Sequence, residues 1–145
     1  MYVLYTGLTI REEAMASRFL KPKRRVLVVD DDPDVRTFLC DLLSHWRCKA
    51  IPAASGWEAL EVLQGRPVDV VLLDVAMPIM DGAETLCEIN RLAPDLPVIM
   101  MSALMTSNLR QHLCELGAQG YLAKPMDREA LAVALLPYLI QEDSA

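Results

Sequence analysis

The chain has 145 residues, of which 53% are hydrophobic and 23% charged, and its formal net charge at neutral pH is −6. This length and composition predict one globular domain with a substantial core and exclude a disordered chain. Its apolar runs fall short of the roughly 18 residues that a membrane span needs, and no basic residue precedes the apolar start of the chain, unlike in a signal peptide. We therefore expect a cytoplasmic protein that contacts no membrane.

Charge is distributed unevenly along the chain. Residues 1–25 carry six basic and two acidic side chains, whereas residues 26–145 carry eight basic and eighteen acidic ones. An acidic domain is not expected to bind nucleic acid through its general surface. The basic run from Lys21 to Arg25 indicates a solvated linker, with contact to nucleic acid or a membrane as the alternative. We expect an N-terminal extension over 1–24, one domain over 25–141 and a tail over 142–145.

The first twenty residues lie outside the pattern of the rest. Thr9 to Glu12 match a helix capping box, and Ala14, Met15 and Phe19 could form one face of a short helix. This segment is either a docking arm or a frayed leader.

From residue 26 onward, strand-like and helix-like segments alternate five times. Short apolar runs of β-forming residues predict strands at 26–30, 48–52, 68–73, 97–101 and 119–123. Cap residues predict helices that begin after Asp32, Ser55 and Asp127, and further helices are expected from Asp81 to about Leu92 and from about Ser107 to Leu116. The first helix is expected to bury a stripe from Val35 to Trp46 that includes Phe38. This alternation predicts an α/β fold with a buried parallel sheet and helices on both faces.

The four cysteines show no CxxC spacing, which disfavours a zinc site or a redox pair. We expect them to be buried free thiols.

Four of the predicted strands end in polar residues that a buried strand would not normally carry. The first ends in Asp30-Asp31-Asp32, the third in Asp74, the fourth in Ser102 and the fifth in Lys124. Parallel strands bring their carboxyl ends to one edge of the sheet, where ligands bind. This edge would therefore combine carboxylates, a hydroxyl and an amine, a set that suits a divalent cation together with a phosphoryl group.

Each of these residues has a structural alternative. Asp32 is interpreted as the helix cap, and because one helix needs one cap, a function is expected for Asp30 or Asp31. Crowded carboxylates stay ionised only if a cation such as Mg²⁺ neutralises them. Asp74 is either a turn aspartate or a nucleophile that forms an acyl phosphate. Lys124 and Ser102 are either ordinary strand ends or donors to phosphate oxygens.

Four motifs together resemble the response-regulator receiver domain of bacterial two-component signalling. They span residues 26–33, 72–82, 101–103 and 117–125, and the resemblance covers about residues 25–141. It implies a flavodoxin-like, doubly wound, five-stranded parallel sheet with strand order 2-1-3-4-5 and helices on both faces.

The resemblance also implies a role for each site residue. Asp74 matches the phosphoacceptor, and Asp30 and Asp31 match the acidic pair that binds Mg²⁺ together with Asp74. Ala76 matches the position whose backbone carbonyl completes the metal shell, and Ser102 and Tyr121 match the two switch residues. Lys124 matches the lysine that pairs with the phosphoryl group, and the Lys124–Pro125 bond resembles the family's cis peptide.

The implied function is a signalling module that is not an enzyme beyond assisting its own phosphorylation and dephosphorylation. A histidine kinase or histidine phosphotransfer protein would supply the phosphoryl group. An output partner or a second copy would then bind through the helix from Ser107, the strand at 119–123 and the last helix. We expect three departures from the family: Ala76 and Leu104 are apolar where some members carry polar residues beside the phosphoryl group, the first twenty residues have no family counterpart, and no output domain is expected after the last helix.

Two other functions remain open from the sequence. The first is an aspartyl-phosphate phosphatase or phosphotransferase on a similar sheet, although the segment after Asp30 lacks the Thr or Val typical of those enzymes. The second is a receiver-like scaffold that is never phosphorylated, which the full set of acidic, hydroxyl and lysine residues disfavours.

Overall fold

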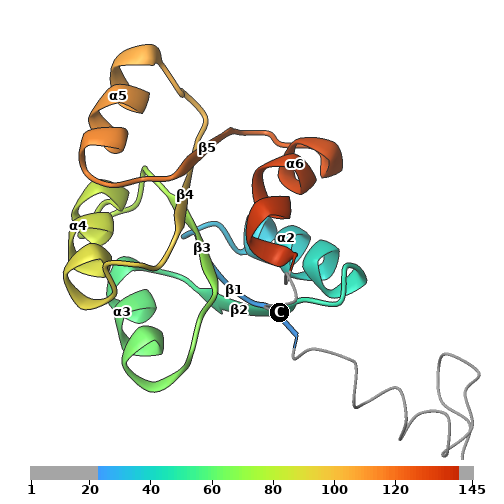
Figure 1. Cartoon of the computed structure of the whole chain (residues 1–145). Helices are drawn as coiled ribbons and strands as arrows, with labels where there is room; N and C mark the ends of the chain where they lie inside the picture. Colours follow the sequence, from blue (N-terminus) through green and yellow to red (C-terminus); the bar gives the residue numbers. More distant parts are fainter. Residues whose placement is uncertain (1–22, 141–145) are drawn as a thin grey trace, which may run out of the picture.

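The computed structural model describes residues 23–140, which form one five-stranded parallel sheet with helices on both faces (Figure 1). The strands are β1 (Arg25–Val29), β2 (Lys49–Ala53), β3 (Val70–Asp74), β4 (Val98–Ser102) and β5 (Gly120–Ala123). The helices are α2 (Pro33–His45), α3 (Gly56–Gly65), α4 (Gly82–Leu92), α5 (Ser107–Glu115) and α6 (Arg128–Leu139). The strand order is β2-β1-β3-β4-β5, which confirms the predicted flavodoxin-like fold.

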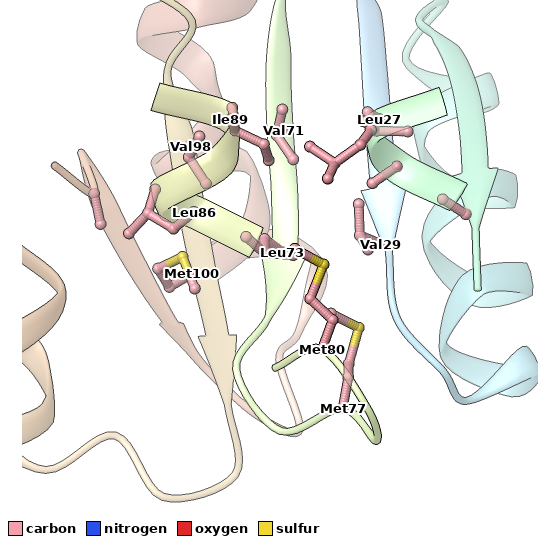
Figure 2. Close-up of a cluster of buried hydrophobic side chains, with 14 of the residues drawn as sticks. Leu27, Val29, Val71, Leu73, Met77, Met80, Leu86, Ile89, Val98 and Met100 are labelled. Atoms are coloured by element: carbon pink, nitrogen blue, oxygen red, sulfur yellow. The ribbon is translucent and has the colours of Figure 1, made fainter. Parts of the chain in front are cut away.

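Each face of the sheet is buried under its own helices. Alternate residues of the central strands, such as Leu27 and Val71, pack against α3, α4 and α5 (Figure 2). The intervening residues, such as Val26 and Leu72, pack against α2 and α6. Because β3 and β4 are buried along their whole length, their sequences are continuously apolar up to the last residue.

The loop after β3 is anchored by two methionines. Met77 and Met80 are buried and extend the core cluster past Leu73 toward the end of the strand (Figure 2). Their place in the core fits the flexible packing of the methionine side chain.

The N-termini of the helices carry the predicted caps. The side chains of Asp32, Ser55, Asp81 and Asp127 each accept a hydrogen bond from a backbone N–H in the first turn of the following helix. Thr106 caps α5 in the same way, and neither Asp81 nor Thr106 was predicted as a cap. In a parallel sheet these helix starts follow the carboxyl ends of the strands, so all five caps lie along the edge that carries the predicted site.

Several details differ from the sequence-based expectations. β3 begins at Val70 rather than at about residue 68, and the Asp69 carboxylate just before it accepts hydrogen bonds from the Arg24 guanidinium and the Arg25 N–H. Phe38 is 46% exposed rather than buried, and Cys87 and Cys114 are exposed rather than buried thiols. These side chains belong to helical faces that nothing in residues 23–140 covers.

The expected N-terminal helix and the tail over 142–145 lie outside the described residues. Within the described part of the chain, no helix combines the length and the apolar character that a membrane crossing requires.

Ile79 adopts a backbone conformation that is unusual for its residue type. Its φ is 71°, and the Met80 N–H donates to the Pro78 carbonyl at 2.8 Å, which closes a γ-turn around it. A β-branched residue in this region is strained, and the Ile79 side chain is 94% exposed and gains little from burial.

We expect Ile79→Asn to raise the free energy of unfolding by about 1 kcal/mol, since asparagine tolerates positive φ and little packing is lost. Urea unfolding of the purified protein would measure the change. The matched control is Ile140→Asn, at an exposed isoleucine with φ −78°, where no gain is expected. A destabilised Ile79→Asn variant would contradict the assignment of strain.

Candidate functional site

The site forms where the chain reverses direction across the sheet. In the sheet, β1 lies between β2 and β3. The chain passes from β1 to β2 on one side and then crosses to β3 on the other side, so β1 and β3 flank the topological switch point, where such sheets bind ligands. Val29 pairs with Leu73, and the next residues along each chain are Asp30 and Asp74. This register brings the two predicted acidic positions side by side.

Three carboxylates converge there. Asp30, Asp31 and Asp74 each place one oxygen atom within 4.8 Å of the other two. Asp30 and Asp74 are buried, at 0% and 4% exposure, whereas Asp31 is open to solvent. The set therefore has two fixed carboxylates at the sheet and one that faces incoming ligands.

Every polar group of Asp30 has a partner. Its N–H donates to the Ala53 carbonyl of β2 at 3.1 Å, and its own carbonyl accepts from Arg36 Nη1 of α2 at 2.7 Å. Its Oδ1 accepts from the Asp32 N–H at 3.0 Å, and its Oδ2 accepts from Lys124 Nζ at 2.5 Å. Four different segments thus hold this residue in place.

Lys124 connects the acidic residues to the far side of the sheet. It follows β5, and its ammonium lies 2.5 Å from Asp30 Oδ2 and 3.1 Å from Asp74 Oδ1. Burial lowers the pKa of Lys124, but its hydrogen bonds to Asp30 and Asp74 outweigh this effect and leave the pKa raised. The peptide bond between Lys124 and Pro125 is cis. The lysine is therefore a fully charged partner for two carboxylates.

The electrostatics of Asp74 reflect this crowding. Burial, and then the negative charge of Asp30, raise its pKa from 3.8 to about 6, although Lys124 opposes the rise. Because this pKa is higher in the folded state than in the unfolded chain, the contribution of Asp74 to stability decreases as the pH rises from about 4 to about 6. Ionised Asp74 therefore lowers the stability of the folded protein, and a bound cation would offset this loss.

Ser102 and Tyr121 occupy neighbouring strands but different surroundings. Ser102 ends β4 next to the site, and its Oγ accepts from the Leu104 N–H at 3.1 Å. Tyr121 belongs to β5, and the guanidinium of Arg110, a residue of α5, lies 5.2 Å from the centroid of its ring. Its buried hydroxyl has no hydrogen-bond partner among the described residues. The structure therefore places Ser102 beside the acidic residues and Tyr121 on the adjoining α5–β5 surface.

The loop after Asp74 contains Ala76 and is closed by Gly82. Ala76 is exposed, and the Gly82 N–H donates to the Val75 carbonyl at 2.8 Å. A Cβ on Gly82 would lie 2.3 Å from the Asp74 carbonyl oxygen, too close for any side chain. This contact, like that of Arg36 with Asp30, arises from tertiary packing.

The donor set fits Mg²⁺. This cation prefers oxygen ligands and is usually held by one or two carboxylates together with water and phosphate oxygens. Three carboxylates with converging oxygens, one of them exposed, offer such ligands. Because burial and then the charge of Asp30 raise the pKa of Asp74, a bound cation would favour its ionised form.

Comparisons with known proteins agree with this geometry. The family model described as the response regulator receiver domain matches residues 26–136. The transcriptional regulatory protein ZraR of Klebsiella oxytoca is 39% identical over 110 residues, which cover 76% of this chain and 25% of that relative. The sensor histidine kinase GacS of Pseudomonas protegens is 33% identical over 132 residues, covering 88% of this chain and 14% of the kinase. The chain thus spans a quarter or less of these curated relatives.

Solved structures show the same fold. The chemotaxis protein CheY4 of Vibrio cholerae superposes with a TM-score of 0.78 at 30% identity, covering 81% of this chain and 100% of that one. The CheX–CheY–BeF3–Mg complex of Borrelia burgdorferi gives a TM-score of 0.76 at 30% identity, covering 81% of this chain and 90% of that one.

Proposed function

The chain belongs to the response regulator receiver family, and from this membership we propose that Asp74 accepts a phosphoryl group in a Mg²⁺-dependent reaction. The observation that carries the proposal is the convergence of Asp30, Asp31 and Asp74 within 4.8 Å, with the Lys124 ammonium 3.1 Å from Asp74. A two-component receiver needs a nucleophilic carboxylate, a metal site and a cation for the phosphoryl oxygens, and these four residues supply all three.

The reaction is a transfer from nitrogen to oxygen. A carboxylate oxygen of Asp74 attacks the phosphorus of a phosphohistidine, the donor's P–N bond breaks, a P–O bond forms, and the released imidazole takes its proton from solvent. The product is an acyl phosphate on Asp74. Mg²⁺ would be held by Asp30, Asp31, Asp74 and the backbone carbonyl of Ala76. When bound, it would supply positive charge that balances the negative charge of the phosphoryl oxygens.

The chain's own residues prepare the nucleophile. Asp74 has only 4% exposure, and the rigid end of β3 fixes its position. Lys124 keeps the carboxylate ionised near neutral pH by opposing the effect of burial on its pKa. The same ammonium is placed to pair with a phosphoryl oxygen once Asp74 is modified.

We propose a histidine kinase or histidine phosphotransfer protein as the donor. A cleft of about 450 Å³ lies directly beside Lys124, lined mainly by apolar residues of α2 and of the β5–α6 loop, among them Phe38 and Met126. Because this cleft opens at the same edge of the sheet as Asp74, it offers a donor protein apolar contact close to the reacting group.

For the output we propose the surface of α5, β5 and α6. A shallow cavity of about 860 Å³ there is lined by Arg110, Tyr121 and Val133, among others. Phosphorylation would act through Ser102 and Tyr121 to change the affinity of this surface for an output partner or a second copy. We further propose that residues 25–141 form the receiver domain, 1–24 an extension and 142–145 a tail.

The proposal predicts that a small phosphodonor and Mg²⁺ add the mass of one phosphoryl group to the protein, and that Asp74→Asn abolishes the addition. Intact-protein mass spectrometry would measure it, with Asp69→Asn as the matched control, since Asp69 pairs with Arg24 at the other end of the strands. Modification that persists in Asp74→Asn, or that survives chelation of the metal, would refute the assignment.

A second prediction concerns Asp31. We expect Asp31→Asn to weaken Mg²⁺ binding and to stabilise the metal-free protein, because Asp31 adds to the negative charge around Asp74. The gain should be small, about 0.5 kcal/mol, since Asp31 is exposed and solvent screens its charge. Titration calorimetry and melting of the metal-free protein would test the two effects, and unchanged Mg²⁺ affinity would remove Asp31 from the site.

A further inference from the structure

Arg36 makes a contact with the acidic site that the proposed function does not use. Its Nη1 donates to the backbone carbonyl of Asp30 at 2.7 Å. Pairing of β1 with β3 ends at Val29, so the sheet provides no partner for this carbonyl. The guanidinium therefore completes the hydrogen bonding of a fully buried acidic residue.

The start of α2 brings Arg36 to this carbonyl. Asp32 caps the helix, Pro33 is its first residue, and the Arg36 N–H donates to the Asp32 carbonyl at 3.1 Å. Side chains of a helix point back toward its N-terminus, so the half-buried guanidinium returns over the first turn to Asp30. One side chain thus ties the second turn of α2 to the end of β1.

We propose that Arg36 is a positioning residue that fixes the Asp30–Asp32 turn and thereby sets the Mg²⁺ affinity of the acidic cluster. This inference rests on the proposed function, because it takes Mg²⁺ as the ligand of Asp30, Asp31 and Asp74. Arg36 bonds to the backbone of Asp30, whereas Lys124 bonds to its carboxylate. The Arg36 contact therefore does not compete with a ligand for the carboxylate oxygens of Asp30.

The two possible roles of Arg36, fixing the turn and supplying positive charge, predict opposite effects of its removal on cation affinity. If Arg36 acted only as a nearby positive charge, its removal would strengthen the binding of a cation. If it fixes the turn, its removal lets Asp30 and Asp31 move out of register and weakens binding. Losing a residue that orients metal ligands typically costs 10- to 100-fold in affinity, and with three other segments still holding Asp30 we expect about tenfold.

The test compares Arg36→Met and Arg36→Lys with Arg91→Met. Arg91 lies on the surface of α4 and pairs with Glu88, so its loss removes the same charge without touching the site. Mg²⁺ alone is titrated into each metal-free protein by calorimetry, at a temperature at which every variant is fully folded. We expect about tenfold weaker binding for Arg36→Met, an intermediate value for Arg36→Lys, which keeps a donor but not the planar fork, and no change for Arg91→Met.

A second readout does not involve the metal. In the NMR spectrum of the metal-free protein, Arg36→Met should shift or broaden the amide signals of Asp30, Asp31 and Asp32 while leaving those of β4 unchanged. A lower melting temperature with parental Mg²⁺ affinity, or tighter binding in Arg36→Met, would overturn the proposal. If Arg36→Met does not fold, parental affinity and amide signals in Arg36→Lys would also overturn it. Failure of the parent protein to bind Mg²⁺ would instead refute the proposed function.

Discussion

Replacing Lys124 by methionine is expected to lower the free energy of unfolding of the metal-free protein by about 3 kcal/mol at neutral pH, because it leaves two buried carboxylates without their cation. Asp30 is fully buried and Asp74 is 4% exposed, and both hydrogen bond to the same ammonium. Removing one partner of a buried pair costs much more than the pair contributes, since the remaining charge loses both water and its counter-ion.

Urea unfolding in the presence of a chelator would measure this loss. Lys49→Met is the matched control, because Lys49 is exposed on β2 and its removal should change stability by less than about 0.5 kcal/mol. Adding Asp74→Asn to Lys124→Met should restore much of the loss, because it removes one of the two unpaired charges. If Lys124→Met were as stable as the parent without metal, the ion pairs would have no structural importance.

The local pattern of the sequence was sufficient for the architecture. Parallel strands that are buried on both faces are apolar over most of their length, so β1, β3 and β4 appear as continuous apolar runs, and the polar residues at or just after their ends mark the edge of the sheet. Helix starts were equally clear, because caps such as Asp32 and Asp127 act on backbone groups within the same few residues. β2 is less regular because Pro52 interrupts it, which an edge strand tolerates.

What the sequence could not provide depends on packing between distant segments. The contact of Gly82 with the Asp74 carbonyl and that of Arg36 with the Asp30 carbonyl are fixed only when loops and helices dock on the sheet. The exposure of Phe38 is a similar case, because a helical stripe shows which residues share a face but not how far the neighbouring helix extends over it. The site residues were therefore predictable as strand ends, and their supporting contacts were not.

The surroundings of Asp74 also bear on how long a phosphoryl group would remain there. Loss of an acyl phosphate requires a water molecule in line with the phosphorus, and a polar side chain that orients this water speeds the reaction. Ala76, two residues after Asp74, is exposed and carries no polar group. Leu104, two residues after Ser102, is 77% exposed and carries none either. We therefore expect slow self-dephosphorylation, so that the signal persists until a phosphatase or reverse transfer removes it.

The combined variant Ala76→Asn, Leu104→Glu should lose its phosphoryl group about ten times faster, which corresponds to about 1.4 kcal/mol of the barrier. Mass spectrometry of the phosphorylated protein at intervals after removal of the phosphodonor would give both decay rates. Leu92→Glu is the matched control, because it adds the same charge at an exposed leucine at the C-terminal end of α4, where the rate should not change. Loss of the phosphoryl group from the parent within seconds, or equal decay in parent and variant, would show that the polar character of these two positions does not set the lifetime.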